Sequence, residues 1–161
     1  MDHLWTPWRS TYIKSKKNEG CIFCLAAESS DDEAALVVYR ARLNFLILNR
    51  YPYTNGHLMI APYRHAARLN ELDETTTAEM MQLARLAESV LENVYQPHGL
   101  NVGLNLGEAA GAGIEQHLHL HALPRWKGDA NFMTSIAETR IVPELLEETY
   151  RKLRAGIAAA V

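Results

Sequence analysis

Three histidines alternate with two leucines over five residues, in the run His117, Leu118, His119, Leu120 and His121. Because successive side chains of a β-strand point to opposite faces, a strand here places the imidazoles on one face and the leucines in the core. The whole chain has seven histidines, so three on one face indicate a chemical site rather than unrelated core residues. We expect a strand over His117–Leu123 that ends at Pro124.

The histidine run suits two chemistries. Neutral imidazoles bind metal ions, and an imidazole also acts as a nucleophile toward phosphorus, with its neighbours setting tautomer and charge. The preceding segment favours phosphorus, because Gly107–Gly113 is a loop of very small residues. Its glycines (Gly107, Gly111 and Gly113) let backbone N–H groups approach an anion closely.

The rest of the chain predicts strands, a helix, more strands and a second helix. Strands are expected over Leu36–Arg40, Asn44–Asn49, His57–Ala61 and Asn101–Leu106. Apolar residues recur at helical spacing within Asp73–Gln96, and a C-terminal helix is expected over Pro143–Ala160. This order predicts an α+β fold: a five-stranded antiparallel sheet with one long central helix and a C-terminal helix.

Length and charge narrow the possible functions. A chain of 161 residues predicts a single domain with its own core. A formal net charge of −3 argues against a nucleic-acid polymer as partner, since phosphate neutralisation needs clustered Lys and Arg. No apolar run is long enough to span a membrane, and Met1–Tyr12 lacks a signal-peptide core. We expect a cytoplasmic protein without a membrane partner.

Two runs resemble the hallmark motifs of the histidine-triad (HIT) family: NRYPYTNGHLMIAPYRH at residues 49–65 and QHLHLHALPRW at residues 116–126. The match covers residues 21–128 of a single HIT domain, with an N-terminal arm over 1–20 and a C-terminal extension over 129–161. The arm's Trp5, Trp8 and Arg9 and the run PRWKGDANF are similar to a bacterial branch described as diadenosine tetraphosphate phosphorylases. The arm is too apolar for a free tail, so we expect it to pack on the domain or a partner subunit.

The resemblance implies catalytic roles for the histidines. His119 would attack the α-phosphorus and form a nucleotidyl-histidine, while its other ring nitrogen donates to a backbone carbonyl. His121 would bind phosphate oxygens, and His57 would support the triad or be simply a partly buried strand histidine. His117, the first of the triad, would act in catalysis unless it binds a metal.

The resemblance also implies nucleotide contacts. The residues implied are Asn49 at the ribose, Phe23 and Leu48 around the base, and Asn105, Gly107, Gly111, Gly113 and Gln116 at the phosphates. Asn49 is also explained as a turn residue, and the two apolar residues as ordinary core. The sequence departs from the family at Ile114, where many members carry Ser or Thr, so contacts to the leaving group fall to backbone N–H groups, Gln116 or a partner chain.

Cys21 and Cys24 form a C-x-x-C motif, which suggests half a metal site or a redox pair. In the related galactose-1-phosphate uridylyltransferases, such a motif joins two histidines, whose positions here are His65 and His117. Two thiolates and two imidazoles would form a closed, structural zinc site. The alternatives are two buried free thiols or, less in keeping with the context, a redox pair.

The resemblance implies nucleotidyl transfer by double displacement on adenine (di)nucleotides, as a diadenosine tetraphosphate phosphorylase or hydrolase, without a catalytic metal. It also implies a homodimer with the long helix and a strand edge at its interface. One alternative is a purine nucleotide phosphoramidase or adenylate hydrolase. Others are a hydrolase whose three strand histidines bind a metal, and a nucleotide-binding module with little turnover.

Overall fold

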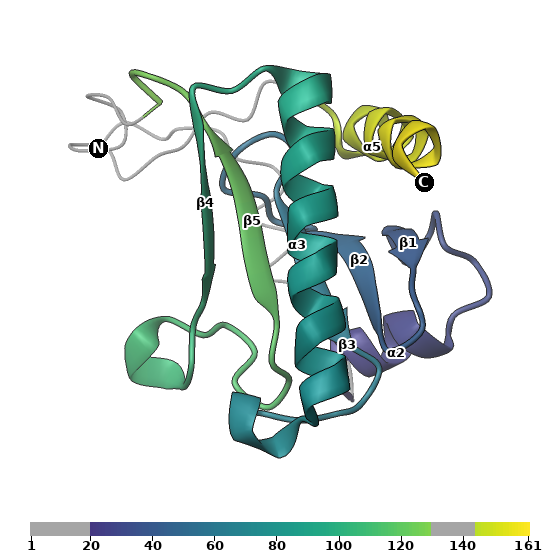
Figure 1. Cartoon of the computed structure of the whole chain (residues 1–161), viewed down its shortest axis with the longest axis vertical. Coiled ribbons are helices and arrows are strands. Elements are labelled where there is room, and N and C mark those ends of the chain that lie inside the picture. The colour runs from purple at the N-terminus through teal and green to yellow at the C-terminus, as the bar shows by residue number, and fades with distance from the viewer. Residues whose placement is uncertain (1–19, 130–143) are drawn as a thin grey trace, which may run out of the picture.

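The computed structural model describes residues 20–129 and 144–161. Its centre is a five-stranded antiparallel sheet with the strand order β1-β2-β3-β5-β4 (Figure 1). The strands are β1 (Val37–Arg40), β2 (Asn44–Leu48), β3 (Leu58–Pro62), β4 (Gly99–Leu104) and β5 (Leu120–Arg125). The helices are α2 (Ile22–Glu28), α3 (Glu74–Tyr95) and α5 (Leu146–Ala160). The predicted fold class is confirmed.

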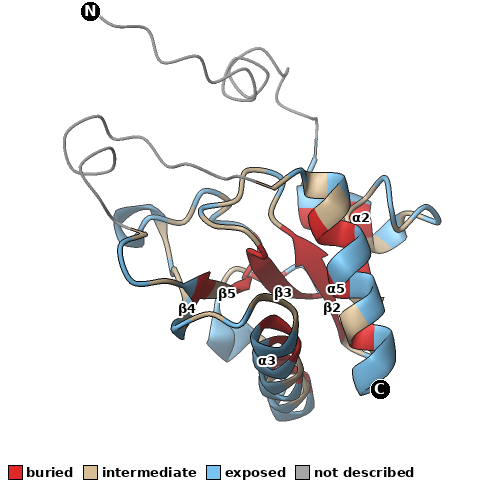
Figure 2. Ribbon diagram, turned by 90° about the horizontal axis from the view of Figure 1, so that it is seen from above, coloured by how far each residue is buried: buried red, intermediate tan, exposed pale blue. Residues whose placement is uncertain are grey.

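Helix α3 covers one face of the sheet, as the predicted apolar stripe requires (Figures 1 and 2). The Asp73 carboxylate caps the helix by accepting a hydrogen bond from the Thr76 backbone N–H at 2.8 Å. Gln96 ends it in the left-handed region, with φ at 47°. The side chains of α3 that it buries against the sheet include Met80, Leu83, Ala84, Ala87, Val90 and Leu91. No helix in the described part of the chain is long and apolar enough to cross a membrane.

Helix α5 packs beside α3 and against β1. Gly156 permits the close approach of the two helices, because an added Cβ would lie 2.8 Å from Val94 and 3.1 Å from Val90. The Tyr150 hydroxyl donates to the Val37 carbonyl at 3.2 Å, which ties α5 to the sheet. Part of the expected helix from Pro143 lies outside the described residues, as do most of the expected N-terminal arm and residues 130–143 of the extension.

Helix α2 lies on the opposite side of the strands from α3 (Figure 2). It was not expected from the sequence. Phe23 is fully buried there in a second apolar cluster with Ala26, Val37, Phe45, Ile47, Met59 and Ala61. The sheet therefore has an apolar face under α3 and a second face that α2 shares with the histidines.

The last strand differs from the one expected over His117–Leu123. β5 begins at Leu120 and continues through Pro124 to Arg125. The Pro124 carbonyl accepts from the Thr54 hydroxyl at 3.2 Å, on the side away from β4. A residue's N–H and C=O point to the same side of a strand, so the missing N–H of Pro124 removes no hydrogen bond to β4.

Candidate functional site

The candidate site lies on the sheet face opposite α3. Leu118 and Leu120 are buried in the core beneath α3, so the alternating histidines face the other way, as the sequence predicts. His121 pairs with Met59 on β3 and with Gly103 on β4, and Met59 pairs with Ile47 on β2. These residues form one row across the histidine face of the sheet.

His119 is held in one tautomer. Its Nδ1 lies 2.8 Å from the His117 carbonyl oxygen. Because a carbonyl only accepts hydrogen bonds, Nδ1–H is the donor and Nε2 keeps its lone pair. The ring is 6% exposed, and this burial lowers the pKa of His119 below its ordinary value. At neutral pH, the imidazole is therefore uncharged with a nucleophilic Nε2.

Two successive hydrogen bonds determine the tautomers of His57 and His121. The Tyr53 backbone N–H donates to His57 Nδ1 at 3.3 Å, so His57 carries its proton on Nε2. That Nε2 lies 2.9 Å from His121 Nδ1, which accepts, leaving His121 Nε2–H as a free donor for an anion. Burial, together with the nearby His119, lowers the pKa of His121 to about 4. His121 thus donates as a neutral imidazole.

His117 faces a different set of groups. Its Nδ1 lies 3.2 Å from Cys21 Sγ, 3.6 Å from Cys24 Sγ and 3.2 Å from His65 Nδ1. Cys24 Sγ lies 3.3 Å from His65 Nδ1, and the four ligand atoms all lie within 4.8 Å of one another. The four residues predicted as metal ligands are thus brought together and could hold a metal ion.

The chemistry of this cluster fits a metal ion. His117 Nε2 donates to the Pro62 carbonyl at 2.9 Å, which fixes the tautomer with a lone pair on Nδ1, toward the thiols. Burial, with the adjacent Cys21 as a further cause, raises the pKa of the Cys24 thiol. Two neighbouring thiolates therefore need a cation between them. Cys21 is the residue before α2 and Cys24 lies in the first turn, so the start of the helix presents both thiols to one ion.

The three strand histidines do not form a metal site of their own. In residues 20–129 and 144–161, the group of ligating side chains close enough to share an ion is that of Cys21, Cys24, His65 and His117. His119 and His121 lie outside this group, and the Nδ1 of each is already engaged, with the His117 carbonyl and with His57 respectively. The geometry therefore gives no support to a hydrolase with a three-histidine metal centre.

The loop between β4 and β5 lies beside the histidines. Leu104 of β4 pairs with Leu120 of β5 at the end of the ladder. Asn105 and His119 are the next residues along the two segments beyond this pair. Gly107 and Gly111 adopt left-handed φ angles of 88° and 87°, which flank a short 3-10 turn over Glu108–Ala110. Ile114 packs against the apolar cluster of α2, so the side chain at this position anchors the loop instead of offering a hydroxyl.

The expected contacts around the base are partly corrected. Phe23 and Leu48 belong to clusters on opposite faces of the sheet, so they cannot sandwich one base. Ile47, one residue earlier on β2, lies on the histidine face. Asn49 accepts from the Tyr51 N–H through its side-chain oxygen at 2.9 Å, and its own N–H donates to the His57 carbonyl at 3.0 Å. These bonds hold Asn49 next to His57.

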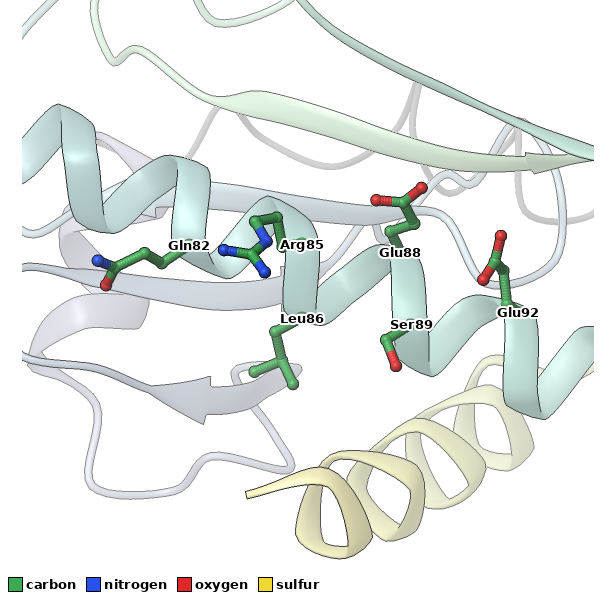
Figure 3. A pocket seen from close by; sticks show the side chains of 6 residues that line it. All are labelled: Gln82, Arg85, Leu86, Glu88, Ser89 and Glu92. Atoms are coloured by element: carbon green, nitrogen blue, oxygen red, sulfur yellow. The ribbon is translucent and has the colours of Figure 1, made fainter.

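A hollow along α3 has no connection to this chemistry (Figure 3). It is lined by side chains of that helix alone: Gln82, Arg85, Leu86, Glu88, Ser89 and Glu92. None of the histidines or cysteines described above contributes to it. This hollow is therefore separate from the candidate site on the histidine face.

Comparisons with known proteins agree with this geometry. A HIT domain model matches residues 31–128. The chain is 43% identical over 162 aligned positions to a Mycobacterium tuberculosis protein named AP-4-A phosphorylase, covering 95% of this chain and 83% of that protein. It is 31% identical over 93 positions to a Schizosaccharomyces pombe bis(5'-nucleosyl)-tetraphosphatase (asymmetrical), covering 58% of this chain and 50% of that protein. A zinc-bound histidine triad family protein from Mycobacterium smegmatis shares the fold with a TM-score of 0.72 and 28% identity, covering 88% and 95% of the chains.

Proposed function

The chain belongs to the HIT domain family, and on that premise we propose that it cleaves diadenosine tetraphosphate through a covalent nucleotidyl-histidine at His119. The observation that carries this proposal is the tautomer of His119, with Nδ1–H donated to the His117 carbonyl and Nε2 left for attack. The 43% identity to a protein named AP-4-A phosphorylase supports the choice of substrate.

The proposed reaction has two displacements. In the first, His119 Nε2 forms a bond to the α-phosphorus, the bond from phosphorus to the bridging oxygen breaks, and ATP leaves with the electron pair. In the second, an oxygen of inorganic phosphate attacks the same phosphorus, the P–N bond breaks, and ADP leaves. The electron pair returns to Nε2, so neutral His119 is regenerated. Neither step requires a catalytic metal bound by the protein.

The neighbours of His119 suit the charge that develops on phosphorus. His121 would donate its Nε2–H to a phosphate oxygen, because its Nδ1 is already occupied by His57. Asn105 and the backbone of the loop that contains Gly107, Gly111 and Gly113 would supply further donors. Asn49 would contact the ribose, and Ile47 would support the base on the histidine face.

Hydrolysis is the second candidate, and the similarity to the asymmetrical tetraphosphatase favours it. The test is turnover of diadenosine tetraphosphate with and without inorganic phosphate, with the nucleotides separated by chromatography. ADP and ATP that form only with phosphate identify a phosphorylase, and AMP and ATP formed without it identify a hydrolase. If nothing is turned over, phosphoramidate and aminoacyl adenylates are tested next. Nucleotide binding without turnover of any of these overturns the enzyme proposal.

The cluster of Cys21, Cys24, His65 and His117 would bind zinc, as its two sulfur and two nitrogen ligands suit. The zinc-bound relative supports the choice of metal. A closed four-ligand site supplies structural stability, tying α2 and the segment after β3 to the histidine run. His117 would then position His119, whose Nδ1 donates to the His117 carbonyl.

A homodimer and a cytoplasmic location complete the proposal. β4 is an edge strand whose Val102 is 47% exposed, and a second copy would cover this edge together with the outer face of α3. Sedimentation velocity tests this, with Val102→Lys expected to shift the protein toward monomer. The two cysteines are arranged as metal ligands rather than bonded to each other, which suits a reducing compartment.

A further inference from the structure

A hollow of about 410 Å³ opens next to the start of the histidine run, between two segments far apart in the chain. The segment after β3 contributes His65, Ala67, Arg68 and Glu71, and the loop before β5 contributes Gly107, Glu115 and Gln116. His65 also belongs to the four-residue cluster proposed to bind zinc, so the hollow borders that cluster. We call this hollow the side pocket. Its size lies within the range of small-molecule sites. Gly107 and Gln116 also belong to the loop that the proposed function assigns to the phosphates, so the side pocket continues that site.

The polar side chains of the side pocket differ in whether they already have a hydrogen-bond partner in the protein. The Arg68 side chain is exposed and enters no ion pair or side-chain hydrogen bond with residues 20–129 or 144–161. Glu71 is engaged, because its Oε2 accepts from the Ala67 backbone N–H at 2.8 Å. Glu115 and Gln116 are exposed, with no such partner in the same ranges. Arg68, Glu115 and Gln116 are therefore free to contact a ligand.

This mixture of charges suits a nucleoside better than a phosphate chain. Two carboxylates and one guanidinium give a local excess of negative charge, which repels phosphate. Ribose hydroxyls and a purine amino group, in contrast, are donors that a carboxylate and an amide oxygen accept. A guanidinium stacks on the face of an aromatic ring, as on a purine. Each free side chain of the side pocket thus has a partner on adenosine.

The position of the side pocket matches the leaving group. Extended backbone advances at most about 3.6 Å per residue, so the Cα atom of Gln116 lies within about 11 Å of that of His119. The three phosphates of the leaving ATP form a chain of comparable length. The leaving ATP is therefore long enough for its adenosine to reach the side pocket while its near phosphate is still at His119.

We propose that the side pocket binds the distal adenosine of the dinucleotide, with Arg68 stacked on the purine and Glu115 and Gln116 as hydrogen-bond partners. This inference rests on the proposed function, since it concerns the leaving half of the same substrate. It assigns to Arg68 the preference for a dinucleotide over a mononucleoside polyphosphate.

The experiment compares two substrates that share the reacting phosphorus. Diadenosine tetraphosphate carries the distal adenosine, and adenosine 5'-tetraphosphate has the same phosphate chain without it. We expect Arg68→Gln to lower kcat/KM for diadenosine tetraphosphate about tenfold, the scale of a lost cation–π contact, and to leave adenosine 5'-tetraphosphate within twofold of wild type. The matched control is Arg64→Gln, an exposed arginine of the same segment outside the side pocket. It should change neither value.

Each other outcome contradicts a different statement. Equal loss on both substrates means that Arg68 acts on the phosphates or on the fold, and overturns the adenosine assignment. No loss on either substrate also overturns it. If the wild-type protein turns over neither substrate, the proposed function itself fails, and this inference fails with it.

Discussion

His117 and His119 lie two residues apart in the same run, yet their imidazoles are held in opposite tautomers. His117 donates from Nε2 to the Pro62 carbonyl, which leaves Nδ1 for the cysteine side of the molecule. His119 donates from Nδ1 to the His117 carbonyl, which leaves Nε2 for a substrate. In both cases, a backbone carbonyl determines which ring nitrogen keeps its lone pair.

The backbone around the two histidines thus prepares one residue type for two different chemistries within five residues. The two rings differ in the carbonyl that each one meets, and hence in the nitrogen that each one offers. Phe23 contacts both, with ring centroids 5.1 Å from His117 and 4.7 Å from His119. Helix α2 therefore joins the proposed metal site to the proposed catalytic site, and the variants below separate the two.

The largest effect is expected at the catalytic end. His119→Asn removes the proposed nucleophile, so kcat for diadenosine tetraphosphate should fall by about 10⁴-fold or more, as for other covalent nucleophiles. Nucleotide affinity, measured by calorimetry, should stay within about threefold because the other contacts remain. Retained turnover contradicts the role of His119. Zinc content is the internal control and should not change.

Substitution of a proposed zinc ligand should lower the stability of the protein rather than the rate of the chemical step. His65→Gln removes one proposed zinc ligand, so we expect loss of stoichiometric zinc and a Tm lower by about 10 °C, which corresponds to several kcal/mol. His98→Gln is the matched control. His98 is another exposed histidine, and its Nδ1 accepts from the Lys127 N–H at 2.9 Å. Unchanged zinc content and Tm in His65→Gln, measured by elemental analysis and calorimetry, contradict the zinc proposal.

The titration of His121 gives an intermediate effect. Its folded-state pKa of about 4 lies below the ordinary value of 6.5, so between these pH values the unfolded chain binds the proton and the folded chain does not. The free energy of unfolding is therefore highest above pH 6.5 and falls by about 1.4 kcal/mol per pH unit toward pH 4. Urea unfolding at several pH values should show a steeper slope for wild type than for His121→Gln. Equal slopes contradict burial of a neutral His121.

The smallest effect is expected far from both regions. Gly156→Ala places a Cβ 2.8 Å from Val94, a stiff β-branched side chain, and this overpacking costs about 2 kcal/mol. Better helix propensity offsets about 1 kcal/mol. We expect a net loss of about 1 kcal/mol, seen as a Tm lower by ~3 °C, with zinc content and kcat unchanged. A change in kcat here would mean that stability and chemistry are not separable in this fold.

Much of this arrangement could be predicted from the sequence. The helix expected over Asp73–Gln96 is observed as Glu74–Tyr95, since its apolar period and its cap agree. The alternation of histidine and leucine correctly predicted which side chains lie in the core and which lie on the other face, although His117 and His119 precede β5. There the backbone pairs outside the sheet ladder, with the Leu118 N–H donating to the Ala66 carbonyl at 2.6 Å.

Two features could not be predicted, for physical reasons. Every residue of β2 is buried, because both faces of this strand are covered, so alternation cannot say whether Ile47 or Leu48 faces the histidines. Helix α2 has only seven residues and no side-chain cap, so no local signal predicts it. It is stabilised by tertiary packing of Phe23 and by the position of Cys21 and Cys24 beside His117.

Identifying the modified residue in the covalent intermediate tests whether His119 is the nucleophile. The protein is mixed with diadenosine tetraphosphate without inorganic phosphate and quenched at alkaline pH, which protects a P–N bond. It is then digested, and its peptides are fragmented in a mass spectrometer. The account predicts an AMP adduct on His119, absent from His119→Asn. An adduct on His117 or His121, or turnover without any adduct, would contradict it.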